Sequence, residues 1–479
     1  MKESVTRPWT GHRMPASASG RRRGGAHRSR PRPQRLPRLK ARLRLGLQSP
    51  AVARLRKPGT ARNIMRTAGF NFASTAASGL GGIILARALG PTSRGDYAAV
   101  TAWFGMALMV GGMGQPAALC FFVARDPGRA RQYVATSRAM MLATGAVAIA
   151  AGMLLVPLLS RGNPVVAGGY RIAFGLSIAS FVGASYTFSL QARDLHRWNV
   201  VRVTQPVLGF AAVVVLWRIR LLTLDVAMVV LAATVLAQLA WAYRGCRRAG
   251  LAPGRMNAAL IRPLATYGVA QIAALTPAAL NADLDQLVLS QTVPPADLGR
   301  YAIAVSLSSL PIPLVAAIGN VVFPRLAAQR SVTGATRQMQ RIAILGSVGL
   351  AVAMLLPLAV AAFWLVPVIF GAGYRGAVPL LWILTPGAVF LSCGQVTGDL
   401  LRGRNHPSVV AWAQGLAVIF TVVLLIALLP LVGVAGAAIA STTAYGFALG
   451  AMLRSLWRLP RHARGSGRIV PVERLQPES

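Results

Sequence analysis

The chain has 479 residues, of which 54% are hydrophobic and 13% are charged, and its mean hydropathy is +0.54. These proportions exclude a protein whose surface is exposed to water over most of its length. The 51 Lys and Arg residues outnumber the 11 Asp and Glu residues and give a formal net charge of +40, which is typical of proteins that bind nucleic acid or an anionic membrane. The basic residues lie in an amino-terminal tail and in short breaks between apolar stretches, so we expect a membrane and no nucleic acid as partner.

Residues 1–62 form a basic tail that we expect to be disordered. The stretch RRRGGAHRSRPRPQRLPRLKARLRL combines like charges with Pro and Gly, and it has too few apolar side chains to offset the conformational entropy lost on folding. No apolar segment typical of a cleaved secretory signal directly follows it. Three interpretations stay open: attraction to the anionic cytoplasmic leaflet, an unstructured extension, or a chain that starts at Met65.

From about residue 63 the chain alternates apolar stretches with short breaks that contain Arg. A helix needs about 20 apolar residues to cross the hydrocarbon core of a bilayer. The pattern predicts twelve transmembrane helices, at about 64–88, 97–124, 139–160, 171–191, 201–217, 222–243, 264–291, 299–323, 342–370, 377–400, 408–430 and 432–453. Backbone polar groups in lipid must be satisfied inside a helix or a closed barrel, and these stretches lack the alternation of barrel strands. The fold class is therefore an all-α integral membrane protein.

The Arg residues predict the orientation of these helices. The breaks after even-numbered helices contain about eighteen Arg, whereas those after odd-numbered helices contain about eight. Both chain ends fall on the richer side, and Lys and Arg are in excess on the cytoplasmic side of membrane proteins. We therefore expect a multi-pass protein of a bacterial-type plasma (inner) membrane with both termini in the cytoplasm.

A shift of about 204 positions reveals an internal repeat. It places GPTSRGDYAAVTAW (residues 90–103) over PPADLGRYAIAVSL (residues 294–307), so that Gly95 matches Gly299 and Tyr97 matches Tyr301. At nearly the same shift, residues 191–205 match residues 400–414. Helices one to six are thus predicted to be duplicated as helices seven to twelve.

The repeat determines the expected domain organisation. Six helices per repeat give both halves the same orientation, so their symmetry axis runs along the membrane normal and a pathway between the two lobes is expected. After the tail, the predicted parts are a six-helix lobe at 63–248, a cytoplasmic linker at 249–263, a second six-helix lobe at 264–455, and a basic cytoplasmic tail at 456–479.

The seventh predicted helix contains the most informative polar residues. Ionisable groups inside a membrane cost roughly 2.5–3.5 kcal/mol on insertion scales and usually face a bundle interior or a watery cavity. At 100° per residue, a polar and small-residue stripe that suits a cavity wall is formed by Tyr267, Gln271, Ala274, Ala278, Asn281, Asp285 and Thr292. Asp283 lies on nearly the opposite face and needs another partner. The alternative is a static ion pair between Asp285 or Asp283 and an Arg such as Arg87.

Gln115, in the second predicted helix, is a further candidate, although loop capping is the favoured role for such interfacial polar residues. No catalytic motif of the GxxxxGK, HExxH or GxSxG type is present, and the outer breaks of about six to twelve residues are too short for a separate active site. The cysteines lie far apart without CxxC spacing, which argues against a disulfide framework or a zinc site. We expect neither enzymatic activity nor a bound metal.

Three sequence segments resemble a known family. ILARALGPTSRGDYAAV (residues 84–100), LDQLVLSQTVPPADLGRYAIAVSL (residues 284–307) and VVFPRLA (residues 321–327) look like the polysaccharide flippases of the Wzx type. These belong to the multidrug/oligosaccharidyl-lipid/polysaccharide (MOP) exporter superfamily, together with MATE and MurJ-like proteins. The resemblance implies two six-helix lobes around a central cavity and alternating access. By the same resemblance, Asp285 occupies a position at which members of the family often have an acidic residue.

The function implied by the resemblance is transport of an oligosaccharide linked to polyprenyl pyrophosphate from the inner to the outer leaflet. Asp285, Asn281 and Gln271 would line the cleft, Arg87 would meet phosphate, and Asp285 could couple transport to a proton or cation without other cofactors. Partners would be the lipid-linked glycan, membrane lipids, and the polymerase and glycosyltransferases of the same pathway. The alternatives are a cation-coupled MATE-like exporter of small molecules, a membrane-embedded glycan ligase or polymerase, and a scaffold without transport.

Overall fold

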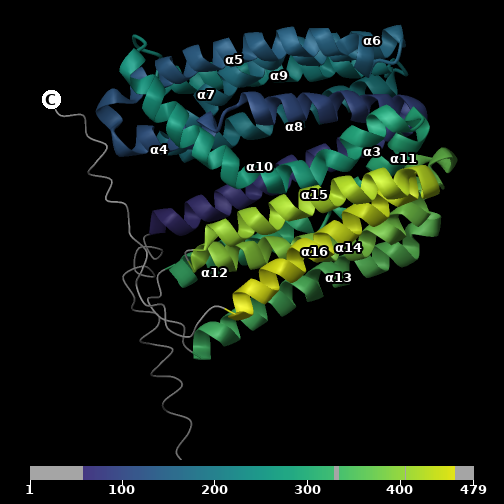
Figure 1. Cartoon of the computed structure of the whole chain (residues 1–479). Helices are drawn as coiled ribbons and strands as arrows, with labels where there is room; N and C mark the ends of the chain where they lie inside the picture. Colours follow the sequence, from purple (N-terminus) through teal and green to yellow (C-terminus); the bar gives the residue numbers. More distant parts are fainter. Residues whose placement is uncertain (1–57, 328–333, 405, 459–479) are drawn as a thin grey trace, which may run out of the picture. The chain divides into compact units, whose positions relative to one another are not determined.

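The computed structural model describes residues 58–327, 334–404 and 406–458, and every regular element within these ranges is a helix. The expectations for the tails at residues 1–57 and 459–479 lie outside the described residues. The amino-terminal lobe consists of α3 (Pro58–Gly111), α4 (Gln115–Arg125), α5 (Ala130–Leu159), α6 (Pro164–Gly175), α7 (Ser177–Arg193), α8 (Leu195–Arg218) and α9 (Leu224–Arg248). The carboxy-terminal lobe consists of α10 (Ile261–Thr292), α11 (Pro295–Ser308), α12 (Ile312–Ala327), α13 (Gly334–Phe370), α14 (Ala377–Gly403), α15 (Pro407–Val432) and α16 (Val434–Arg458) (Figure 1).

Helix α3 is two helices joined at a break. Gly90 has φ 71° and ψ 175°, a conformation that lacks a penalty only for glycine, and Pro91 follows it without a backbone N–H donor. The first segment is the first predicted span. The second segment continues, after a turn at residues 112–114, into α4, and together they form the second predicted span.

The membrane architecture agrees with the sequence-based prediction. By length and hydropathy, ten described helices could cross a membrane, or eleven if the bent pair Ala258–Ile272 and Thr276–Thr292 is one span. In these numbers α3 is one helix, although Gly90 divides it into two segments. Counting its two segments separately accounts for all twelve predicted spans.

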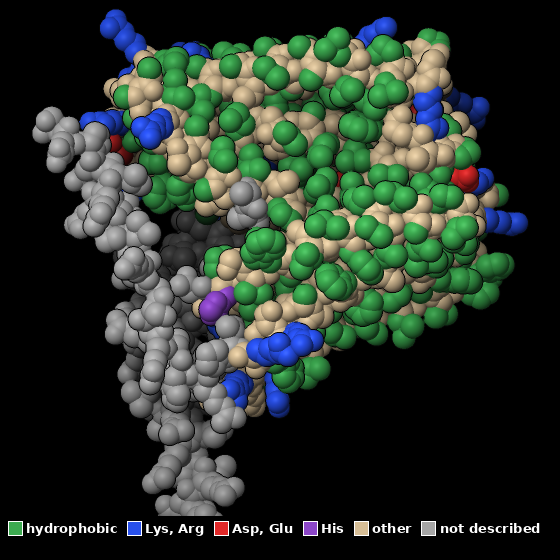
Figure 2. Space-filling model, viewed as in Figure 1, with side chains coloured by type: hydrophobic (Ala, Val, Ile, Leu, Met, Phe, Trp, Pro, Cys, Tyr) green, Lys and Arg blue, Asp and Glu red, His purple; other side chains and the backbone are tan. Residues whose placement is uncertain are grey.

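The surface in view carries hydrophobic side chains across the middle and Lys and Arg at its two ends (Figure 2). Large apolar side chains are highly exposed on several helices, for example Leu154 at 82% on α5 and Leu431 at 80% on α15. Apolar exposure of this extent is unfavourable in water and favourable in lipid. The protein is therefore a multi-pass membrane protein.

Buried apolar side chains of many helices from both lobes pack together at one end of the described molecule. One cluster combines residues of both lobes, such as Val100 and Tyr170 with Tyr301 and Leu381. Toward the opposite ends of the helices there are two separate clusters. One, around Leu190, combines helices of the amino-terminal lobe with the linker and the start of α10, and the other lies within the carboxy-terminal lobe. The lobes therefore pack together at the end that contains Gly95, which we call the closed end.

Candidate functional site

The closed end is built around two matched glycines. A Cβ atom on Gly95 of α3 would overlap the carbonyl oxygen of Pro295, and a Cβ atom on Gly299 of α11 would overlap the carbonyl oxygen of Pro91. Both contacts join the same pair of repeat positions, because Pro91 and Gly95 correspond to Pro295 and Gly299 at the shift of 204. The two repeats thus meet where α3 crosses α11. Each helix has a glycine at the crossing, and because glycine has no side chain the two backbones come into contact.

Arg87 strengthens this end from the first segment of α3. Its Nη1 donates to the carbonyl oxygen of Val368 at 3.0 Å and to that of Ile369 at 3.4 Å, near the carboxyl end of α13. The last carbonyls of a helix have no partner within the helix and carry partial negative charge, so a guanidinium group stabilises them. The alternative of a static ion pair between Arg87 and an aspartate of α10 is not realised, because these carbonyls hold the guanidinium instead.

Two further hydrogen bonds cross between the lobes here. The hydroxyl of Tyr374 donates to the carbonyl oxygen of Ala86 at 2.9 Å, and Arg161 Nη1 donates to that of Val293 at 2.9 Å. Burial raises the pKa of the Tyr374 hydroxyl to about 12, so it stays protonated and remains a donor at neutral pH. The closed end is held by backbone carbonyls of both lobes.

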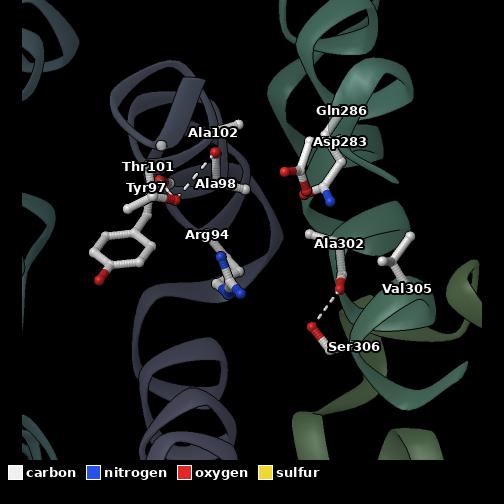
Figure 3. A pocket seen from close by; sticks show the side chains of 11 residues that line it. Arg94, Tyr97, Ala98, Thr101, Ala102, Asp283, Gln286, Ala302, Val305 and Ser306 are labelled. Carbon is white, nitrogen blue, oxygen red and sulfur yellow. Dashed lines mark hydrogen bonds between the residues drawn. The ribbon is translucent and has the colours of Figure 1, made fainter. Parts of the chain in front are cut away.

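A polar pocket lies next to the closed end, between α3 on one side and α10 and α11 on the other (Figure 3). Its volume is about 250 Å³. Both lobes supply its walls, through Arg94, Tyr97, Ala98, Thr101, Ala102 and Gly105 of α3, Asp283 and Gln286 of α10, and Ala302, Val305 and Ser306 of α11. We call it the Arg94 pocket.

Opposite charges face each other across the Arg94 pocket without an ion pair. The Arg94 guanidinium lies 5.5 Å from the centre of the Tyr97 ring, and its Nε has no hydrogen-bond partner among the described residues. Asp283 is exposed on the opposite wall, and within the described ranges its carboxylate forms no salt bridge. An unpaired guanidinium in a low-dielectric setting is a strong donor to an anion such as phosphate.

The neutral side chains of the pocket extend its hydrogen-bonding capacity. The hydroxyl of Thr101 donates to the carbonyl of Tyr97 at 2.8 Å, and that of Ser306 donates to the carbonyl of Ala302 at 2.7 Å. Their oxygens therefore stay available as acceptors, while the Gln286 amide can both donate and accept. A ligand that carries an anionic group and several hydroxyls would find partners for both.

Asp285 does not line the Arg94 pocket, contrary to the expectation from the sequence. It is 2% exposed and points into the carboxy-terminal lobe. Its Oδ2 accepts hydrogen bonds from the Tyr301 hydroxyl and, at 2.8 Å, from the Ser441 hydroxyl. The Asp285 carboxylate thus joins α10 to α11 and α16. The aspartate that lines the Arg94 pocket is Asp283, two residues earlier.

Asn281 is buried one turn away on the same face of α10, and it too lies off the pocket. Its Oδ1 accepts from the Thr421 hydroxyl of α15 at 2.7 Å, and its backbone carbonyl accepts from the Tyr445 hydroxyl at 3.3 Å. Its Nδ2 has no partner among the described residues. This part of the predicted stripe therefore belongs to the core of the carboxy-terminal lobe.

The start of the stripe contacts the amino-terminal lobe, because α10 is bent. The axis turns by 59° between Ala258–Ile272 and Thr276–Thr292. In the first half the Tyr267 ring stacks on Phe121 of α4, with centroids 4.7 Å apart, while Gln271 is half-buried. A single polar face requires a straight helix, and the bend, near Pro277, divides that face between the two lobes.

Gln115 begins α4 and is 2% exposed. Neither side-chain polar atom has a hydrogen-bond partner within the described part of the chain. Gly114 precedes it with φ 62°, and a Cβ atom there would overlap the backbone of Gly268 in α10. Gln115 is therefore beside the first half of α10 and outside the Arg94 pocket.

Arg94, Thr101, Gln286 and Ser306 are pocket residues that the sequence-based prediction missed. A signal existed for one wall: Arg94, Ala98, Thr101 and Gly105 follow the i, i+4, i+7, i+11 spacing of one helix face. It was missed because the apolar stretch begins after Arg94, which placed this residue in a break. Among the described residues, no group of three or more His, Cys, Asp or Glu is arranged to hold a metal ion.

The fold is similar to that of solved membrane transporters. An inward-facing multidrug resistance MATE family transporter of the MOP superfamily aligns with a TM-score of 0.68 at 13% identity, over 80% of this chain and 94% of its own. The lipid II flippase MurJ in an inward closed conformation aligns with a TM-score of 0.66 at 11% identity, over 83% and 88%. A MOP superfamily transporter from Pyrococcus furiosus aligns with a TM-score of 0.54 at 12% identity, over 83% and 95%.

These similarities confirm the predicted MATE/MurJ-like fold of two six-helix lobes. A search of curated protein sequences gave no match. The sequence model described as "Polysaccharide biosynthesis protein" matches residues 60–330, which is more than half of the chain and includes the reciprocal glycines and the Arg94 pocket. The chain therefore belongs to the polysaccharide biosynthesis protein family.

Proposed function

We propose that this protein is a transporter that moves an oligosaccharide linked to polyprenyl pyrophosphate from the inner to the outer leaflet by alternating access. The observation that carries the proposal is the Arg94 pocket, whose charged and hydroxyl groups come from both lobes and lie beside the closed end. A sugar head group that crosses hydrocarbon unaided loses its hydrogen bonds to water, at several kcal/mol for each polar group. A polar seam between lobes replaces those bonds while the prenyl tail stays in lipid.

Each charged residue of the pocket has a role in this proposal. The Arg94 guanidinium would bind phosphate, because charge-assisted hydrogen bonds are the strong ones. The Asp283 carboxylate and the Gln286 amide would bind sugar hydroxyls from the opposite wall. At about 250 Å³ the pocket is smaller than the roughly 300–1,000 Å³ typical of ligand sites, so passage of a whole head group requires the lobes to separate further.

The excess of Arg on one side determines the proposed orientation of the protein in the membrane. By the positive-inside rule the closed end faces outward, and the lobes receive the head group from the cytoplasmic side. Asp285, held between α10, α11 and α16, is the proposed site at which a proton or cation couples to the movement. The lipid-linked product would then reach polymerases and transferases of the same pathway at the outer surface.

The test is transport of a labelled lipid-linked oligosaccharide in reconstituted vesicles. We expect Arg94→Gln and Asp283→Asn each to reduce the initial rate by about 10- to 100-fold, which corresponds to one lost charged hydrogen bond of roughly 1.5–3 kcal/mol. Matched controls are Arg171→Gln and Asp225→Asn, two exposed residues on α6 and α9 that lie outside the pocket. Movement no faster than in protein-free vesicles would contradict the proposal, and export of a small cationic drug by the same vesicles would favour the MATE-like alternative.

A further inference from the structure

A second pocket, of about 330 Å³, lies between α8 and α9 in the amino-terminal lobe. It shares no residue with the Arg94 pocket and is lined by His196, Arg197, Val200, Val201, Trp241, Arg244, Gly245 and Arg248. Its walls thus contain three guanidinium groups and an imidazole but no carboxylate. We call it the Arg244 pocket.

Two of the three guanidinium groups are unpaired. Arg244 and Arg248 are exposed on the last turns of α9, and within the described ranges neither forms a hydrogen bond or an ion pair. Arg197 is paired with Asp194 at 3.0 Å, so the nearest carboxylate is already neutralised. The pocket therefore carries a net positive charge that nothing in the described protein compensates, and an anion would be attracted to it.

The start of α8 adds to this attraction. The Asp194 side chain accepts from the backbone N–H of Arg197 at 3.0 Å and begins a helix of 24 residues, whose positive end lies at the pocket. The other walls are apolar, with Val200, Val201 and the indole of Trp241, which is 44% exposed. Tryptophan is enriched where a membrane surface meets water, because one part of its ring system is apolar and the other polar.

We propose that the Arg244 pocket binds the phosphate-bearing headgroup of an anionic phospholipid. Arg244 and Arg248 would hold the phosphate oxygens through bidentate hydrogen bonds, with Arg197 nearby. Trp241 and the two valines would contact the glycerol and the first methylene groups, which a free phosphate ion lacks. The combination of clustered basic residues and an apolar wall between two transmembrane helices is suited to a lipid headgroup. The inference is independent of the transported substrate.

The internal repeat provides a matched comparison. A shift of 210 places His196, Arg244 and Arg248 on His406, Arg454 and Arg458 in the other lobe, where α16 has the same 25-residue length as α9. The same shift places Arg197 on Pro407 and Trp241 on Ala451. The carboxy-terminal lobe thus repeats two arginines of the pocket without its third guanidinium and its indole.

The experiment measures retained lipid on the purified full-length protein by native mass spectrometry, with phosphatidylglycerol and phosphatidylcholine as probes. We expect wild type to retain phosphatidylglycerol preferentially. Arg244→Gln/Arg248→Gln should weaken this binding at least about tenfold, and Arg454→Gln/Arg458→Gln, which removes the same charge, should change it less than about twofold. Arg244→Lys/Arg248→Lys keeps the charge and should weaken binding about threefold, because the bidentate geometry is lost.

Three outcomes would overturn the proposal. Equal losses in the two Gln double variants would show that the basic rim acts only as a diffuse charge. Unchanged retention in both the Gln and the Lys variants of the pocket would place the lipid elsewhere. Displacement of phosphatidylglycerol by inorganic phosphate at equal concentration would show that the pocket recognises a free anion and that the apolar wall contributes nothing.

Discussion

Replacement of Gly299 by Ala is expected to open the closed end and to destabilise the protein. The added methyl group would overlap the backbone carbonyl of Pro91, and a backbone atom packed against Gly95 cannot move aside as a flexible side chain can. Overpacking of this kind costs typically 1–3 kcal/mol. We expect a lower melting temperature in detergent and a loss of transport of about tenfold or more, because the lobes no longer meet. Gly95→Ala should behave in the same way, since the contact is reciprocal.

Gly82→Ala, in the first segment of α3, is the control for this prediction. A Cβ atom on Gly82 would have no heavy atom within 4 Å outside its own helix turn. Ala is favoured over Gly in a helix by roughly 1 kcal/mol, so the control should leave the melting temperature unchanged or raise it. The same substitution is thus expected to change stability in opposite directions at the two positions. Equal melting temperatures for Gly299→Ala and wild type would contradict the tight crossing.

Asp285→Asn is expected to abolish coupled transport while the protein stays folded. Asparagine has the size of aspartate and keeps an oxygen that can accept from the Tyr301 and Ser441 hydroxyls, so α10, α11 and α16 remain joined. It removes the negative charge to which a proton or cation would bind. We expect the transport rate to fall by about 100-fold or to lose its dependence on an imposed ion gradient, with a melting temperature within a few degrees of wild type.

Tyr301→Phe distinguishes the structural from the coupling role of this carboxylate. It leaves Asp285 charged but removes one donor, and a buried acceptor without its partner costs about 1–3 kcal/mol. This variant should be less stable but still respond to the gradient. The control is Asp297→Asn, because Asp297 pairs with Arg300 at 2.7 Å at a half-buried position that water still reaches, where a salt bridge contributes little. Full, gradient-dependent transport by Asp285→Asn would limit Asp285 to holding the three helices together.

The sequence predicted the parts of this protein that depend on local chemistry. Long apolar stretches determine the spans, since lipid leaves a backbone without hydrogen-bonding partners and forces helix formation. The match of Gly95 with Gly299 identified the duplication, and in the structure these two glycines touch. Local conformational preference also explains the break at Gly90, which Pro91 follows, and the start of α11 at Pro295.

The assignment of the aspartates could not be obtained in the same way. Helical periodicity separates Asp283 from Asp285, but it cannot say which of the two faces the other lobe. That depends on the bend of α10, on the position of α16, which brings Ser441 to Asp285, and on the approach of α3, which brings Arg94 to the opposite wall. The last two are contacts between segments far apart in the chain.

The amino-acid sequence alone was sufficient to determine that this chain crosses the membrane many times as helices and that its two halves are related, because hydrophobic length and sequence repetition are properties of the segments themselves. The tertiary structure alone decided that Asp283 and Arg94 share a pocket while Asp285 is buried with Tyr301. The reason is physical: a polar side chain inside a membrane protein goes where a partner can satisfy it, and the partner is supplied by helix packing rather than by sequence neighbours.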